Sequence, residues 1–237
     1  MVLLLDFGNT RLKWAVATPS RTLLRQGAIE YVSAALDDWC RMLAAEPICR
    51  IRYASVVTPA QELDVLSRFP LPAERFEVTA AAGSLRNAYA TPQTLGVDRW
   101  AAAIGAWSLV GQPCLVIGAG TATTIDLIEV DGAMGVYRGG LILPGVDLML
   151  QSLHQRTARL PQATGVYRSA PDIADNTHDA MTSGAIEATC GAIERMGQRL
   201  PTGAAWLVNG GRAPLLKDAL GDRLRIAEDL VLAGLAV

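Results

Sequence analysis

The segment VLLLDFGNTRLKWAVA, residues 2–17, decides the fold of this chain. Two apolar runs, residues 2–5 and 12–17, flank the turn-forming residues 6–10 at the spacing of a β-hairpin. A second stretch, CLVIGAGTATTIDLIEV at residues 114–130, repeats the order of strand, Gly-Thr turn and strand. Because an ordinary α/β protein does not need two such units, we predict a duplicated two-domain architecture, although a coincidence could produce the same pattern.

The rest of the chain alternates between strand and helix patterns. A Gly-Gln-Pro break at 111–113 separates an N-terminal domain, residues 1–111, from a C-terminal domain, residues 112–237. Residues 80–96 show little periodicity and are expected to form a loop, and long loops are often functional. The other expected strands are 51–57, 75–78, 134–137 and 205–208, and the expected helices are 32–45, 61–69, 98–110, 146–160 and 177–200.

Composition excludes several classes of protein. The chain has 237 residues, of which 51% are hydrophobic and 19% are charged, so it is neither disordered nor fibrous. A net charge of −2 disfavours nucleic acid as the principal ligand. The uncharged stretch 100–125 is broken at 111–113, so no transmembrane segment is expected. With no basic leader and no CxxC among its four cysteines, the chain is expected to be cytoplasmic, without a zinc cluster or disulfide framework.

The first hairpin combines groups that suit a polyphosphate ligand. Asp6 ends a buried strand, and Gly8 and Asn9 permit a turn with positive φ. Turn amides and the Thr10 hydroxyl can bind phosphoryl oxygens, while Lys13 can offset their charge. Asp6 can hold a metal ion through water. An ordinary hairpin turn is the structural alternative for this segment.

Two further motifs carry polar groups suited to chemistry. The Gly-rich turn GAGTATTID, residues 118–126, supplies hydroxyl groups, close backbone approach and the Asp126 carboxylate, although its threonines also suit a plain strand. In GVDR, residues 96–99, Asp98 is expected near the positive N-terminal end of a helix with Arg99 adjacent. Both features favour the ionised carboxylate, which can accept a hydroxyl proton. Asp is also a preferred N-cap residue, so a structural role stays open.

The motifs DFGNTRLK (6–13), GVDR (96–99) and GTATT (120–124), in this order and spacing, resemble those of type III pantothenate kinases, a family that includes the Bvg accessory factor proteins. The resemblance spans nearly the whole chain. It implies an α/β fold with two duplicated ribonuclease H-like domains of the acetate and sugar kinase, Hsp70 and actin superfamily, with ATP in the cleft. It also implies transfer of the ATP γ-phosphoryl group to the terminal hydroxyl of pantothenate, the first step of coenzyme A synthesis.

The resemblance also implies roles for individual residues. The expected ATP-binding residues are Asp6, Phe7, Gly8, Asn9, Thr10, Arg11, Leu12, Lys13 and Thr121. Asp98 is the implied proton acceptor, and Gly210 and Gly211 are expected to pass beside the adenosine. The implied pantothenate site consists of Tyr89, Gly96, Val97, Asp98, Arg99 and Thr177, with Arg99 a natural partner for the substrate carboxylate. Mg²⁺ is the expected metal, with Asp6 and Asp126 as candidate ligands, and a homodimer is the expected assembly.

One position departs from the family pattern. Many members have an Asp two residues before the Gly-Thr of the second loop, where it is similar to a monovalent-cation ligand. This chain has Gly118 there. A dedicated K⁺ or NH₄⁺ site is therefore in doubt.

Two rival functions remain open from the sequence. Another kinase of the same superfamily, acting on a sugar or a short acid, would carry similar nucleotide loops. A non-catalytic accessory protein would bind nucleotide or influence transcription. A decayed enzyme is expected to lose Asp6, Lys13 or Asp98, yet all three are present.

Overall fold

A computed structural model describes all 237 residues, which form two compact units. The first unit comprises Met1–Gly111 together with Asp229–Val237, and the second comprises Gln112–Glu228. The C-terminal segment therefore packs with the first unit, whereas the expected range 112–237 placed it in the second. None of the helices combines the length and the apolar character that a membrane crossing requires.

The first unit is built on a mixed sheet with the strand order β3-β2-β1-β4-β5. β1 pairs antiparallel with β2 and parallel with β4, β2 pairs antiparallel with β3, and β4 pairs parallel with β5. The strands are β1 (Val2–Phe7), β2 (Leu12–Ala17), β3 (Leu23–Ile29), β4 (Arg50–Ser55) and β5 (Ala73–Arg75).

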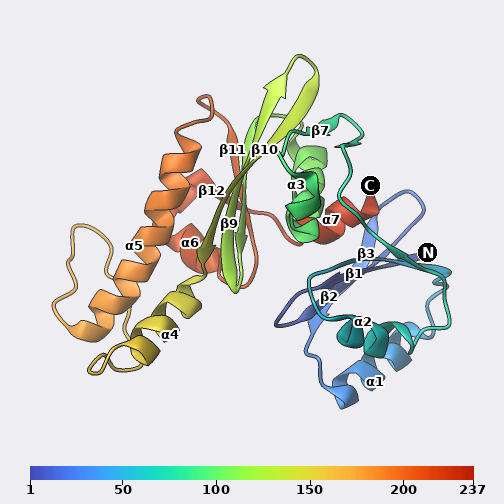
Figure 1. Cartoon of the computed structure of the whole chain (residues 1–237), viewed down its shortest axis with the longest axis horizontal. Helices are drawn as coiled ribbons and strands as arrows, with labels where there is room; N and C mark the ends of the chain where they lie inside the picture. The colour runs from blue at the N-terminus through green and yellow to red at the C-terminus, as the bar shows by residue number, and fades with distance from the viewer. The chain divides into compact units, whose positions relative to one another are not determined.

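Helices cover both faces of this first sheet (Figure 1). On one face, α1 (Ser33–Leu43) and α2 (Pro59–Leu66) contribute Trp39 and Val65 to an apolar core with the strands. On the other face lie α3 (Val97–Val110) and α7 (Leu230–Ala236), which contact β1 and β4. The segment 80–96, expected to be a plain loop, contains the short hairpin β6 (Ala81–Ala82) and β7 (Leu85–Asn87) and the 3₁₀ turn Pro92–Thr94.

Two glycines let α7 approach α3 closely enough to belong to the first unit. A Cβ atom at Gly105 would lie 2.1 Å from the carbonyl oxygen of Leu230, and one at Gly234 would lie 1.8 Å from that of Ala101. The apolar side chains of Leu230, Val231, Leu232 and Leu235 are buried. Burial of this apolar surface is the physical reason that the C-terminal segment joins the first unit.

The second unit has the strand order β12-β11-β8-β9-β10. The elements α4, α5 and α6 pack on one face, where Ile186 and Leu216 meet Ile117 and Ile125 of the sheet. The strands are β8 (Cys114–Ala119), β9 (Ala122–Asp131), β10 (Met134–Pro144), β11 (Ala205–Asn209) and β12 (Leu224–Ile226). The helices are α4 (Val146–Arg156), α5 (Thr177–Gly197) and α6 (Ala213–Leu220), followed by the 3₁₀ turn Gly221–Arg223.

The two sheets share one topology. In each, the first strand is central, pairs antiparallel with the second strand of a hairpin, and pairs parallel with a later strand. The hairpin continues into a third antiparallel strand, β3 in one unit and β10 in the other. The predicted internal duplication is therefore present in the strand order.

Several elements differ from their expected bounds. β3 was not expected, and β5 lies slightly earlier than the predicted strand 75–78. β10 continues well past residue 137, because a bulge at Tyr137/Gly139, with Gly139 at φ +83°, lets pairing resume. Gly140 is needed in the resumed strand, since a Cβ there would lie 1.8 Å from the Ile125 carbonyl oxygen.

Candidate active site

The β1–β2 hairpin places Asp6 and Lys13 opposite each other. The two residues are register partners, so their side chains project to the same face of the sheet. Phe7 and Leu12 are fully buried in the core beneath α1 and α2. Because side chains alternate along a strand, Asp6 and Lys13 lie on the opposite face, which α3 and α7 cover.

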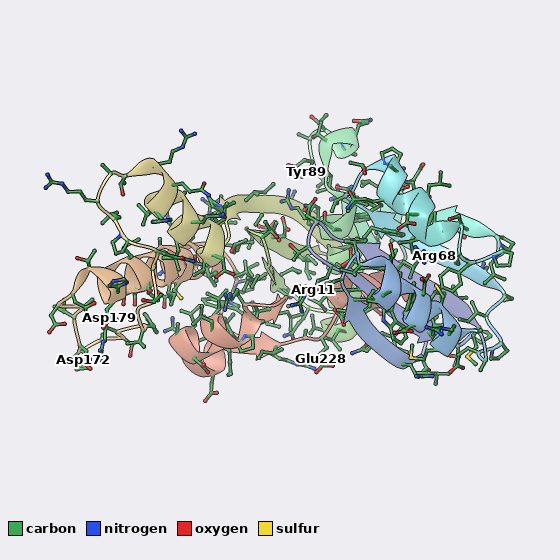
Figure 2. The ribbon with its side chains drawn as sticks, turned by 90° about the horizontal axis from the view of Figure 1, so that it is seen from below. Arg11, Arg68, Tyr89, Asp172, Asp179 and Glu228 are labelled. Atoms are coloured by element: carbon green, nitrogen blue, oxygen red, sulfur yellow. The ribbon has the colours of Figure 1, made fainter.

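The turn of this hairpin differs from expectation in its backbone. Neither Gly8 nor Asn9 has a positive φ. Space is tight at Gly8, because a Cβ there would lie 3.1 Å from the Arg11 carbonyl oxygen. The Tyr31 hydroxyl donates a hydrogen bond of 2.9 Å to the Gly8 carbonyl oxygen. Residues 9–11 are exposed, and Figure 2 labels Arg11 at this turn.

Asp6 is the most perturbed acid of this region. Its side chain is buried, and burial raises its pKa to about 7. The positive charge of Lys13 opposes this shift, whereas the charges of Asp98 and Asp229 add to it. Four ionisable groups, from β1, β2, the start of α3 and the residue before α7, therefore interact at one place in the first unit. Such convergence of perturbed groups is typical of functional sites.

Lys13 is held by a residue that the sequence did not single out. Its Nζ lies 3.0 Å from Oδ1 of Asp229, and the two side chains are 28% and 21% exposed. Asp229 precedes α7 and has a left-handed backbone conformation with φ +42°. No local signal in the sequence points to it, because it meets Lys13 only through the packing of the C-terminal helix.

Asp98 lies in the first turn of α3, which begins at Val97 with Gly96 as its N-cap. The alternative that Asp98 itself caps the helix is therefore wrong. The Arg99 amide donates a hydrogen bond of 2.9 Å to Asp98 Oδ1. Gly96 gives the carboxylate room, since a Cβ there would lie 2.6 Å from the same oxygen. A negative charge in the first turn also interacts favourably with the helix dipole.

Five of the six expected pantothenate residues, all except Thr177, lie near the start of α3. The Arg99 guanidinium lies over the Tyr89 ring, with Cζ 5.7 Å from the ring centroid, and Arg99 is buried. Gly96 and Val97 border an open cavity of about 510 Å³ that Ser55 also lines. This volume falls within the usual range for small-molecule sites. Figure 2 shows Tyr89 in the segment that leads to α3.

The second Gly-rich loop, residues 119–121, is enclosed by two neighbouring turns of the second unit. A Cβ at Gly145 would lie 2.2 Å from the Gly120 carbonyl oxygen, and the Gly145 amide donates to Thr121 O at 2.9 Å. A Cβ at Gly210, which has φ +104°, would lie 2.5 Å from the Ala119 carbonyl oxygen. Gly210 therefore has no room for a side chain, whereas a Cβ at Gly211 would have no atom within 4 Å; the expected place of these two glycines beside the adenosine stays a prediction.

A bidentate ion pair adjoins this loop and was not predicted. Arg212 Nε lies 2.8 Å from Asp147 Oδ2, and its Nη2 lies 2.6 Å from Oδ1. The Arg212 amide also donates to the Ala119 carbonyl oxygen at 3.1 Å. The pair therefore links the start of α4 to the turn before α6. In the sequence, the adjacent Gly210-Gly211 was the only feature that pointed to this region.

Gly118 and Asp126 lie on strands of the same unit. A Cβ at Gly118 would lie 2.7 Å from the Thr124 hydroxyl, so this hydroxyl occupies the space next to it. Asp126 is buried, and its Oδ1 accepts a hydrogen bond of 2.9 Å from the Tyr137 hydroxyl. The structure therefore gives Asp126 a role in packing the sheet, and this partner does not favour it as a metal ligand.

Thr177 is exposed at the first position of α5. The helix start is fixed by Asn176, whose side chain accepts a hydrogen bond from the Asp179 amide at 3.0 Å. Asp179 in turn binds Arg168 Nε at 2.7 Å and the Val166 amide at 2.9 Å, and these bonds lower its pKa to about 2. Figure 2 shows Asp179 at the start of α5 and Asp172 in the preceding loop.

No three His, Cys, Asp or Glu side chains cluster closely enough to hold a metal ion by themselves. Mg²⁺ at phosphate sites commonly uses only one or two carboxylates, together with water and substrate oxygens. Asp6 fits this requirement, because its buried carboxylate has no ion pair to satisfy it. Asp126 fits less well, because it accepts the Tyr137 hydrogen bond.

Comparison with solved structures identifies the fold. A Baf family protein from Campylobacter jejuni matches with a TM-score of 0.63 and 20% identity, over 98% of this chain and 94% of that one. The activator of 2-hydroxyisocaproyl-CoA dehydratase from Clostridium difficile matches with a TM-score of 0.53 and 10% identity, over 99% and 91%. The predicted α/β class is confirmed: the chain has two mixed sheets, and its fold is similar to the folds of these solved structures.

Sequence comparisons identify the family. A protein named type III pantothenate kinase from Aromatoleum aromaticum is 41% identical over 100% of this chain and 97% of its own length. A protein of the same name from an Azoarcus species is 41% identical, over 100% and 90%. The family model described as type III pantothenate kinase matches residues 2–199. By these matches and by its motifs, the chain belongs to the type III pantothenate kinase family.

Proposed function

We propose that this chain transfers the γ-phosphoryl group of ATP to the terminal hydroxyl of pantothenate, producing ADP and 4′-phosphopantothenate in the first step of coenzyme A synthesis. The observation that carries the proposal is the convergence of Asp6, Lys13 and Asp98 on one face of the first sheet. Phosphoryl transfer requires positioning and neutralisation of charge more than covalent chemistry by the protein. Membership of the family supports the same reaction and the same two substrates.

In this proposal the 6–13 hairpin binds the ATP phosphates. Lys13 offsets their negative charge, and the turn residues 9–11 lie exposed at the end of the hairpin. Phe7 and Leu12 contribute through the backbone only, because their side chains are fully buried. Thr121 is assigned to ATP by the family resemblance alone. Asp6 would hold Mg²⁺, which supplies charge neutralisation on the transferring phosphoryl group when it is bound.

Asp98 acts as the proton acceptor. The pantothenate hydroxyl oxygen forms a new bond to the γ-phosphorus, the bond from phosphorus to the ADP oxygen breaks, and the hydroxyl proton passes to the Asp98 carboxylate. The hydrogen bond from the Arg99 amide orients this carboxylate in the first turn of α3. Orientation of the acceptor is a substantial part of its effect, since misplacement by 1 Å can cost about 100-fold in rate.

In this proposal, Tyr89, Gly96, Val97 and Arg99 of the first unit bind pantothenate. The contact between Arg99 and Tyr89 fixes the guanidinium, which is suited to pair with the substrate carboxylate. The cavity of about 510 Å³ beside Gly96 and Val97 supports a small substrate at this place. Thr177 is assigned by the family resemblance, and its exposed position at the first turn of α5 is compatible with ligand contact.

We further propose that turnover does not require K⁺ or NH₄⁺. The position at which many family members have an Asp is Gly118, and the Thr124 hydroxyl lies beside it. We also propose a homodimer, the assembly that the family resemblance implies. Sedimentation velocity across a range of protein concentrations tests the assembly independently of activity.

A coupled ADP-release assay tests the reaction. Purified protein is incubated with ATP, Mg²⁺ and pantothenate in sodium buffer, with and without added K⁺ or NH₄⁺. We expect pantothenate-dependent ADP release of similar rate in all three buffers. A panel of sugars and short hydroxy acids at the same concentration tests the rival substrates.

The outcomes separate the alternatives. Release of ADP with a sugar or hydroxy acid, but not with pantothenate, would identify another kinase of this superfamily. A folded protein that binds ATP yet releases no ADP with any acceptor would favour an accessory role. Stimulation by K⁺ alone would leave the kinase proposal intact but would contradict the proposal about Gly118.

A further inference from the structure

Asp229 does not perform the role that its position at a helix start would suggest. As the N-cap residue of α7, an Asp side chain normally accepts a hydrogen bond from the first turn. Here the side chain makes no capping bond. Its Oδ1 lies 3.0 Å from Lys13 Nζ instead. The backbone is also left-handed at φ +42°, a conformation that an L residue adopts at some cost and that is often found at functional sites.

Lys13 has a second carboxylate within reach on its own sheet. Asp6 is its register partner, and the two side chains project to the same face. Opposite charges in such a cross-strand pair normally attract each other. Nevertheless the ion pair in the structure joins Lys13 to Asp229, and none joins Lys13 to Asp6. The Asp6 carboxylate is thereby left buried and without an ion pair, although the charge of Lys13 still acts on it.

We propose that Asp229 is a positioning residue that holds Lys13 away from Asp6, so that the Asp6 carboxylate stays available to the metal ion of the bound nucleotide. The inference rests on the proposed function, in which Asp6 and Lys13 serve ATP. Without Asp229, the flexible Lys13 side chain turns to Asp6, and the two charges neutralise each other. One ion pair then removes both a metal ligand and a phosphate-binding cation.

The helix that Asp229 precedes, α7, is held firmly enough to position the Lys13 side chain. α7 is fixed against α3 by the close contacts at Gly105 and Gly234, and its apolar residues are buried. The Arg52 Nη1 group also donates to the Leu235 carbonyl oxygen at 2.8 Å. A carboxylate on a rigid element restricts a long, flexible lysine better than one on a mobile loop.

The test measures how much Mg²⁺ strengthens nucleotide binding. Calorimetric titration gives the Kd of ATP in EDTA and the Kd of ATP with excess Mg²⁺. The first Kd divided by the second is the factor by which the metal strengthens binding. Asp229→Asn retains the shape of the side chain and removes its charge, whereas Asp229→Glu retains the charge. Glu46→Gln is the matched control, because Glu46 also pairs with a cation at 2.8 Å in the first unit and is 22% exposed.

We expect Asp229→Asn to reduce this ratio about tenfold, the lower range for loss of a residue that orients a metal ligand. Asp229→Glu should retain most of it, and Glu46→Gln should leave it unchanged. In a Lys13→Met background, Asp229→Asn should cause no further reduction, because no lysine is left to occupy Asp6. Circular dichroism establishes that each variant is folded.

An unchanged ratio in Asp229→Asn would overturn the inference, even if both affinities fell, because general loosening of α7 weakens both forms of the nucleotide alike. A full tenfold reduction on top of Lys13→Met would also overturn it. These readouts need no pantothenate. They therefore separate failure of the inference from failure of the proposed reaction, which shows as ATP binding without pantothenate-dependent turnover.

Discussion

Replacement of Gly105 by Ala should destabilise the first unit, because it forces α3 and α7 apart. The added methyl group would lie 2.1 Å from the Leu230 carbonyl oxygen and 3.0 Å from the Gly234 amide nitrogen. Both neighbours are backbone atoms, so the overlap is relieved only by movement of the helix. Overpacking of this kind costs roughly 1–3 kcal/mol or more. Ala recovers up to about 1 kcal/mol of helix propensity.

The expected net loss is about 2 kcal/mol, taken from the upper part of that range. For a chain of this size, about 2 kcal/mol lowers Tm by roughly 4–8 °C. Thermal unfolding followed by circular dichroism at 222 nm measures it, and urea unfolding gives the free energy independently. Because α7 carries Asp229 at its start, the same variant should also weaken binding of ATP with Mg²⁺.

Gly184→Ala and Gly191→Ala provide controls with the same change in a helix. Both glycines lie within α5, and a Cβ at either would have no atom within 4 Å. Each should be neutral or stabilise the protein by up to about 1 kcal/mol. A Gly105→Ala protein as stable as these controls would refute the reasoning that backbone contact at this glycine fixes α7.

Three other outcomes are expected. Asp98→Asn should lower kcat by roughly 10²–10⁴-fold while the Kd for ATP stays within about twofold, and near-normal turnover in the ADP-release assay would refute its role as proton acceptor. Burial raises the pKa of Asp6 to about 7 in the folded protein, above its unfolded value of 3.8. The contribution of Asp6 to the free energy of unfolding is therefore complete below its unfolded pKa and is lost as the pH rises from there towards 7. Asp6→Asn should therefore flatten the fall in the free energy of unfolding between about pH 4 and 7, a fall of up to about 4 kcal/mol in urea titrations without nucleotide. Asp179→Asn should free residues 164–168 from α5 and speed tryptic cleavage after Arg168 at neutral pH, where the wild-type carboxylate is fully ionised because its pKa is lowered to about 2.

Local sequence was sufficient to predict the two hairpins, because alternation of apolar residues and the turn residues between them are short-range signals. The pairing of Asp6 with Lys13 across β1 and β2 follows directly from that pattern. β3 escaped prediction because it is largely exposed, and its residues LLRQGAI lack the apolar alternation of a buried strand. The hairpin within 80–96 escaped because its strands are only two and three residues long.

The partners of the predicted residues could not be read from the sequence. Asp229 reaches Lys13 only because α7 returns to the first unit, and that return depends on the fit of Gly105 and Gly234 against backbone atoms far away in the chain. A glycine within a helix is the one local sign of such packing, since it costs about 1 kcal/mol relative to Ala and therefore tends to have a structural reason. The pKa of Asp6 likewise depends on burial by α3 and α7, which no motif reveals.

The two units share one topology, but their hairpins carry different side chains at equivalent positions. Counting from the turn, the second register pair is Asp6 with Lys13 in the first hairpin and Gly118 with Thr124 in the second. One unit thus has two charges where the other has a glycine and a hydroxyl group. The second hairpin therefore has no charged side chain at this position, whereas the first has a carboxylate and an ammonium group. Gly118→Asp would place a carboxylate at this position only with rotation of the Thr124 side chain, because the new Cβ would lie 2.7 Å from the Thr124 hydroxyl.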